Sequence, residues 1–154
     1  MVLLVDSSLL LVFVVGTFRR ALVGHHKRTK EYTPEDYDLL KQLLTMDDVK
    51  ILATPNVFTE VSDLLGYGAG KDGRELQKAL GRLVTAVDEQ YVESRRVSRH
   101  DSFPGLGIAD TAMLLLLEAG HELLTVDFDL FQAAQSLGFR ATNFNHLREA
   151  QLLE

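Results

Sequence analysis

The sequence contains no cysteine and no tryptophan, and only three of its 154 residues are proline. The absence of cysteine excludes disulfides, zinc–thiolate sites and thiol nucleophiles, and it is typical of proteins in the reducing cytoplasm. Positive charge is also scarce, because 16 lysines and arginines stand against 22 aspartates and glutamates, a net charge of −6. A polyanionic partner would therefore need a local basic surface or a bridging cation.

The sequence also lacks an apolar run long enough to span a membrane. The stretch LLVDSSLLLVFVVG covers residues 3–16 and contains one charge, Asp6. A membrane helix needs about 20 apolar residues, and a secretory signal needs a basic start and a small-residue cleavage site. Neither requirement is met, so we expect a cytoplasmic protein with no membrane partner. The chain length and the apolar content of 46% suit a single domain, residues 1–154, with a sizeable core.

Short apolar runs alternate along the chain with longer amphipathic or apolar segments, which predicts strands alternating with helices. The predicted strands cover residues 2–5, 50–54, 122–126 and 139–144. Helices are predicted over 9–16, from Thr33-Pro34, from Thr54-Pro55, and over 74–96, 108–120, 127–138 and 145–154, with exposed loops over 19–32 and 66–73. This alternation predicts an α/β fold with a mainly parallel central sheet covered by helices on both faces.

Four acidic residues follow the predicted strands or begin the helices after them. Asp6 directly follows the first strand, and Asp127 directly follows ELLTV. Glu60 lies in the helix after KILAT, and Asp110 begins a helix that is apolar almost all round. Ligands of open α/β sheets bind outside the carboxyl ends of the strands. We therefore expect these four carboxylates to meet at one end of one sheet.

Clustered carboxylates repel one another, and burial raises their pKa values further. A hard divalent cation such as Mg²⁺ or Mn²⁺ resolves this repulsion, because it takes oxygen ligands and completes its shell with water and substrate phosphate. Such a site can activate water and stabilise the charge that develops in phosphoryl transfer. The pattern therefore indicates nuclease chemistry.

Each acid also has a structural explanation. Asp6 and Asp127 suit helix N-caps, and Glu60 suits a solvated helix edge. Asp110 is harder to explain in this way, because a charge on a buried helix needs a partner. The histidines at 25, 26, 100, 121 and 146 show no metal-ligand spacing, so surface positions are expected for all five.

Four segments, in order along the chain, resemble the motifs of the PIN-domain nucleases. VLLVDSSLLL resembles the opening strand and acid, and TPNVFTEVSDLL resembles the second motif with its acid at Glu60. LGIADTAML resembles the third motif, with its acid at Asp110. LLTVDFDLFQAAQSLG resembles the fourth, with Thr125 before the acid at Asp127.

The resemblance implies a three-layer α/β/α sandwich and a Mg²⁺- or Mn²⁺-dependent endoribonuclease. It also implies a homodimer and, as in VapC-type toxins, an antitoxin partner. Asp6, Glu60, Asp110 and Asp127 would form the catalytic site, with Asp129 as a further metal ligand beside Asp6, Asp110 and Asp127. Ser8 and Thr125 would orient water or substrate.

Two basic clusters could hold RNA against such an acidic site, or could equally meet an acidic protein. The candidate RNA contacts are Arg19, Arg20, Lys27, Arg28, Arg95 and Arg96.

Two other functions compete with the nuclease. A phosphoacceptor receiver domain needs adjacent acids after the first strand and a lysine after the last, and this chain has neither. A non-catalytic PIN-fold binding or regulatory module would keep the fold without the activity. The presence of all four acids argues against that module but does not establish turnover.

Overall fold

A computed structural model describes residues 1–154, and its centre is one five-stranded sheet in which every strand pair is parallel. The strand order across the sheet is β3-β2-β1-β4-β5. The strands are β1 (Val2–Val5), β2 (Lys50–Ala53), β3 (Asp88–Glu89), β4 (Glu122–Thr125) and β5 (Ala141–Asn143). The predicted α/β class with a mainly parallel sheet is confirmed.

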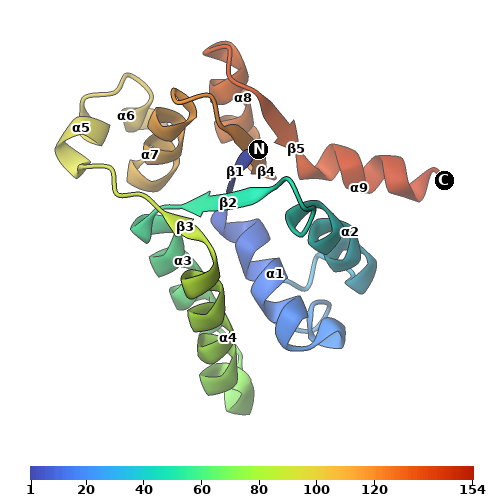
Figure 1. The fold of residues 1–154 in the computed structure, drawn as a ribbon. Coiled ribbons are helices and arrows are strands. Elements are labelled where there is room, and N and C mark those ends of the chain that lie inside the picture. The colour runs from blue at the N-terminus through green and yellow to red at the C-terminus, as the bar shows by residue number, and fades with distance from the viewer.

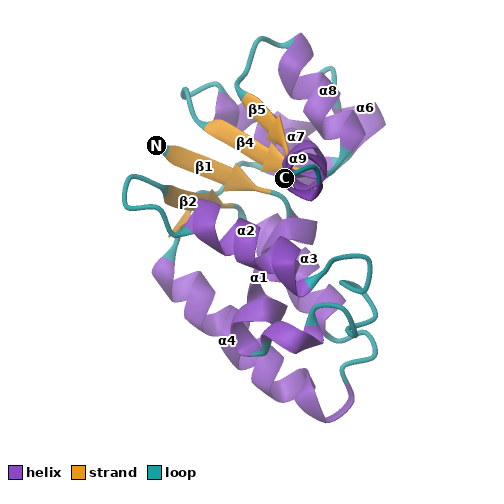
Figure 2. Ribbon diagram, turned by 90° about the vertical axis from the view of Figure 1, so that its right-hand side faces the viewer, coloured by secondary structure: helices purple, strands orange, loops and turns teal.

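Helices cover both faces of this sheet, which gives the expected three layers (Figures 1 and 2). One face is covered by α1 (Ser7–Phe18), α2 (Pro34–Leu44), α3 (Pro55–Leu65) and α4 (Gly73–Ala86). On the other side lie α7 (Ile108–Leu117) and α8 (Phe128–Ser136), with α5 (Ser94–Ser98) and α6 (Phe103–Leu106) packed against α7. The chain ends in α9 (Phe144–Leu152), which follows β5, and single 3₁₀ turns occupy Arg20–Leu22 and Gly70–Asp72. None of these helices is both long and apolar enough to cross a membrane.

The helices begin at the capping residues that the sequence indicates. The Thr33 hydroxyl accepts a hydrogen bond from the Asp36 amide, and the Asp36 carboxylate accepts one from the Thr33 amide, which completes a capping box before α2. The Thr54 hydroxyl caps α3 in the same way, with Pro55 at the first helical position. These caps orient α2 and α3 where the chain leaves or approaches the sheet.

Two helices are apolar on nearly every side because both lie inside the molecule. Seven of the twelve residues of α1 are buried, and so is every residue of α7 from Thr111 to Leu117. Such helices cannot show the one-sided pattern of a surface helix. They join the sheet in one continuous hydrophobic core.

The predicted helix over residues 74–96 is wrong in its second half. Helix α4 ends at Ala86, the backbone extends at Val87, and residues 88–89 pair with β2 as a fifth strand. The Gln90 amide then donates to the Ala53 carbonyl. The apolar residues beyond Ala86 fitted a helical repeat, but hydrogen bonding to the exposed edge of β2 determined their conformation.

Gly16 does not end α1, which continues to Phe18. Gly16 is instead where α2 crosses closely, because a methyl group placed there would lie 2.2 Å from the Tyr37 ring. The last strand is also shorter than predicted, since β5 covers only Ala141–Asn143.

The segment 19–32 is not simply an exposed loop, and His26 is not a surface histidine. His26 is 2% exposed, and Thr29 is fully buried. The His26 Nε2 donates to the Leu65 carbonyl, and the Thr29 hydroxyl donates to the Val23 carbonyl. Buried polar side chains need hydrogen-bond partners, and both of these find one in a backbone carbonyl, which a hydropathy pattern does not reveal.

Candidate functional site

The strand order places two acids at the point where the sheet topology reverses. From β1 the chain builds outward through β2 and β3 on one side, and through β4 and β5 on the other. In sheets of this order, the crevice outside the carboxyl ends of the two central strands is the usual ligand site. Asp6 follows β1 directly, and Asp127 follows β4 after Val126. The crevice between β1 and β4 is therefore acidic.

A hollow of about 460 Å³ opens at this crevice, and all four predicted catalytic carboxylates line it. Asp6, Glu60, Asp110 and Asp127 come from four separate segments of the chain. Ser7 and Ser8 add hydroxyl groups, while no lysine, arginine or histidine lines the hollow. The remaining wall is formed by Leu64, Leu106, Gly107, Ile108 and Ala109.

Asp6 is held in place by three donors. Its Oδ1 accepts from the Leu9 amide at 2.9 Å, so Asp6 is the N-cap of α1. Its Oδ2 accepts from the Val126 amide at 2.8 Å and from the Thr125 hydroxyl. Burial raises the pKa of Asp6, while the Thr125, Leu9 and Val126 hydrogen bonds oppose that rise. Asp6 is therefore both a helix cap and a carboxylate fixed in the crevice.

Thr125 connects Asp6 to Asp127. Its side chain is fully buried, its hydroxyl donates to Asp6, and its oxygen accepts from the Asp127 amide at 2.9 Å. Asp127 in turn caps α8 by accepting from the Leu130 amide at 2.9 Å. Thr125 does not line the hollow, so its role in the structure is to orient the two carboxylates.

Glu60 is tied to the start of α1 by Ser7, a residue that the sequence did not single out. The Ser7 hydroxyl donates to the Glu60 Oε2 at 2.7 Å. This contact links α3 to α1 across the mouth of the hollow. The position of Ser7 directly after the acid of the first motif is the signal that the sequence offers for it, and the predicted Ser8 lines the hollow as well.

Asp110 has no partner. Its carboxylate makes no hydrogen bond or ion pair, although it is half-buried in the first turn of α7. Desolvation raises its pKa to about 7, with further contributions from the charges of Asp127, Glu60 and Asp6. The hollow therefore contains negative charge that the protein itself does not neutralise.

The chemistry of these donors fits a hard divalent cation. All are carboxylate or hydroxyl oxygens. Desolvation and the three neighbouring carboxylates raise the pKa of Asp110, and a bound cation would lower it. The side chains are not preassembled, because no group of three or more Asp, Glu, His or Cys residues is already arranged to hold a metal ion. A cation would have to draw the carboxylates together.

Other predicted site residues lie outside the hollow. Asp129 is exposed in the first turn of α8 and does not line it. Four of the six candidate RNA contacts are engaged in ion pairs, whereas Lys27 and Arg28 form none. The pairs are Arg19–Asp72, Arg20–Asp38, Arg95–Glu93 and Arg96–Glu118.

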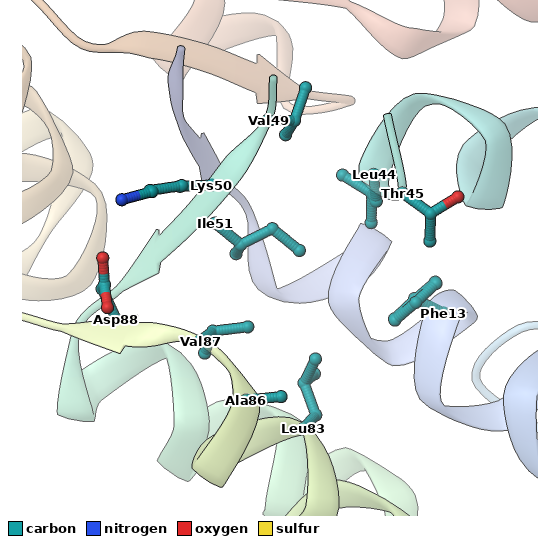
Figure 3. A pocket seen from close by; sticks show the side chains of 10 residues that line it. All are labelled: Phe13, Leu44, Thr45, Val49, Lys50, Ile51, Leu83, Ala86, Val87 and Asp88. Carbon is teal, nitrogen blue, oxygen red and sulfur yellow. The ribbon is translucent and has the colours of Figure 1, made fainter. Parts of the chain in front are cut away.

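A second hollow, of about 370 Å³, lies at the amino end of β2, opposite the acidic crevice (Figure 3). Apolar side chains from α1, α2, α4 and β2 point into it, including Phe13, Leu44 and Ile51. Its two charged residues, Lys50 and Asp88, point away from the apolar centre. Without convergent polar groups, this hollow offers no chemistry.

Comparisons with protein-family models and with curated proteins gave no match. Among solved structures, the chain is similar to a domain of a functionally unknown protein from Methanocaldococcus jannaschii. The two are 18% identical with a TM-score of 0.46, and the similarity covers 92% of this chain and 89% of that one.

Proposed function

We propose that the protein is a metal-dependent endoribonuclease of the PIN type, acting in the cytoplasm. The observation that supports this most strongly is the convergence of Asp6, Glu60, Asp110 and Asp127 in one hollow at the switch point of a parallel sheet. Structural roles alone account for Asp6 and Asp127, which are helix caps. They do not account for Asp110, which is half-buried without a partner, so that keeping its carboxylate charged costs free energy that a bound cation would offset.

Asp6, Asp110 and Asp127 would hold the cation, while Asp129 would act at most from outside the hollow. Bound Mg²⁺ or Mn²⁺ would supply Lewis-acid stabilisation of the negative charge that develops on the scissile phosphate. Asp6 is kept in one orientation by Thr125 and the Val126 amide, so it would be the fixed ligand toward which the other carboxylates move.

Glu60 is the candidate for positioning the attacking water. Ser7 occupies its Oε2, which leaves Oε1 free to accept a hydrogen bond from water in the hollow. Ser8 lines the same wall and can donate its hydroxyl to a phosphate oxygen. The apolar wall, which includes Ile108 and Leu106, limits the number of water molecules that can reach the phosphate from that side.

Asp110→Asn is the sharpest test of this activity. Asp110 makes no hydrogen bond, so the amide removes the charge without breaking a contact. Asp6→Asn is less clean, because an amide nitrogen cannot accept from Val126 or Thr125. We expect Asp110→Asn to reduce Mn²⁺-dependent cleavage of RNA by at least about 100-fold, comparable to the loss of one strong electrostatic contact to the transition state.

The matched control is Asp63→Asn, an exposed acid on the same helix as Glu60 that does not line the hollow. It should cut RNA as the parent does. Equal cleavage by folded Asp110→Asn and the parent would refute the nuclease proposal.

A non-catalytic binding module is the second candidate, and one observation favours it. The carboxylates are not arranged in advance as a metal site. A binding module without turnover would not need such a site. The toxin role, an antitoxin partner and a homodimer belong to the nuclease proposal and rest on the sequence resemblance.

A further inference from the structure

An exposed aromatic ring and three lysine or arginine side chains gather beside the acidic hollow. Lys27, Arg28 and Lys30 are exposed and form no ion pair, and Tyr67 is 46% exposed. The Arg28 guanidinium lies over the Tyr67 ring, 4.2 Å from its centre, and the Lys27 ammonium lies 5.9 Å from the same point. We call these four residues the Tyr67 platform.

The platform is built on buried anchors and is more than a solvated charge run. His26 and Thr29 are buried, and they alternate with the exposed basic residues. The His26 Nε2 donates to the Leu65 carbonyl at 3.2 Å, and its Nδ1 accepts from the Arg28 amide at 3.1 Å. These bonds fix the backbone of Arg28 against the end of α3, directly before Tyr67.

The segments 19–32 and 66–73 also approach each other closely, at Lys27 and Gly68. Gly68 has a φ of +63°, and a methyl group added to it would lie 3.2 Å from the Lys27 Cβ. A glycine is therefore favoured both by the backbone and by the space. The contact keeps Lys27 beside the ring.

Helix α3 connects the platform to the acidic hollow. Glu60 and Leu64 line the hollow, and Tyr67 follows shortly after the helix ends. Tyr67 lies seven residues after Glu60, a separation of about 10 Å if the turn after α3 continues the helical rise. A strand with one phosphate in the hollow can therefore reach the platform with a neighbouring nucleotide.

We propose that the Tyr67 platform is a second binding site for the RNA, at which an unpaired base stacks on the Arg28–Tyr67 pair and the adjoining phosphate contacts Lys27 and Lys30. This inference rests on the proposed function, since it places the strand that the hollow would cut. An acidic protein could form ion pairs with the lysine and arginine side chains, but an exposed aromatic ring beneath an arginine would add nothing to those pairs. Aromatic rings and arginine planes beside a basic surface are how single strands are held.

The electrostatics of the molecule support a separate holding site. The protein has a net charge of −6, and the hollow has four acids and no cation of its own. Without a bound cation an RNA backbone is repelled there, and a neighbouring basic surface would supply affinity that the hollow lacks. A duplex gains less from this platform, because its bases are already stacked and paired.

The test is the fluorescence anisotropy of a labelled short single-stranded RNA, measured in EDTA so that cleavage cannot occur. Tyr67→Ala should weaken binding about 10-fold or more through lost stacking, while Tyr67→Phe should bind as the parent does. Lys27→Gln with Arg28→Gln should also weaken binding. It should lower the slope of log affinity against log salt by about 0.7 for each phosphate contact removed.

The matched control is Lys78→Gln with Arg82→Gln, which makes the same charge change on the exposed side of α4. Equal losses in the two double variants would overturn the platform, because the effect would then reflect net charge alone. Unchanged affinity in folded Tyr67→Ala would also overturn it. So would polyglutamate that displaces the RNA equally well from the parent and from Tyr67→Ala. These outcomes are independent of turnover: RNA cleavage with a silent platform refutes only this inference, and platform binding without cleavage refutes only the nuclease.

Discussion

Two aspartates that look alike in the sequence have opposite environments in the structure. Asp6 accepts three hydrogen bonds and caps α1, so its carboxylate is fully integrated in the fold. Asp110 accepts none, and it faces three other carboxylates. Replacing Asp6 removes hydrogen bonds that stabilise the fold, whatever the function of the protein. A charged Asp110, by contrast, destabilises the fold unless a ligand binds to it. Asp110 is therefore the residue that best reports on function.

We expect the metal-free protein to lose stability between about pH 4 and pH 7. The pKa of Asp110 is about 7 in the folded chain, above its ordinary value of 3.8. In that range the folded state keeps the proton that the unfolded state has lost, so the free energy of unfolding falls as pH rises. Asp110→Asn should reduce this fall, and part should remain because the pKa of Asp6 is also raised.

Urea unfolding in EDTA at pH 5 and pH 8 measures this effect. The difference between the two midpoints should be smaller in Asp110→Asn than in the parent, and it should be unchanged in Asp63→Asn. Identical differences in all three proteins would show that Asp110 is not desolvated as described.

At the scale of elements, the contact between α1 and α2 depends on one missing side chain. Gly16 lies inside α1, two residues before its end, where glycine costs helix stability, yet it is buried against the Tyr37 ring. The Tyr37 hydroxyl also hydrogen-bonds with that of Thr17, one residue further along α1. The glycine thus permits α1 and α2 to cross closely.

A pair of glycine substitutions tests this contact. Gly16→Ala should destabilise the protein by about 1–3 kcal/mol, because the new methyl group overlaps the Tyr37 ring. Gly81→Ala should stabilise it by about 0.5–1 kcal/mol, since that glycine lies in the exposed part of α4 with nothing near its added methyl group.

Urea denaturation gives both values, and the opposite signs are the diagnostic result. If Gly16→Ala were neutral, α1 and α2 would not cross as closely as described. A double-mutant cycle with Tyr37→Ala should assign most of the loss to that ring.

For the whole molecule, the excess of negative charge means that a bound cation is expected to stabilise the folded state. The net charge is −6, and four acids converge in the hollow without a cation from the protein. Repulsion among them opposes the compact state. Anything that neutralises the hollow should therefore stabilise the fold as a unit.

Millimolar Mn²⁺ or Mg²⁺ should raise the thermal unfolding midpoint, since a ligand at 100 times its dissociation constant adds about 2.7 kcal/mol. Asp110→Asn should show a smaller rise or none. KCl at matched ionic strength is the control for general screening of the −6 charge. A divalent effect no larger than that of KCl would favour the non-catalytic binding module.

Much of the fold was visible in the sequence because it depends on local preferences. The strands 2–5, 50–53 and 122–125 are short apolar runs, and Thr33 and Thr54 signal the starts of α2 and α3. What failed was non-local: the helix predicted to residue 96 ends at Ala86 because β2 offered an open edge to residues 88–89. His26 was misplaced for a similar reason, since its partner carbonyl belongs to Leu65, far away in the chain.

The sequence by itself determined the α/β alternation, the helix caps and the acids that follow the strands, because each depends on residues that are neighbours along the chain. Only the tertiary structure decided the strand order, and with it the position of Asp6 and Asp127 on either side of the reversal between β1 and β4. The same holds for the unpaired state of Asp110 and for the stacking of Arg28 on Tyr67. Those properties depend on which distant segments pack together, and packing is set by the whole core.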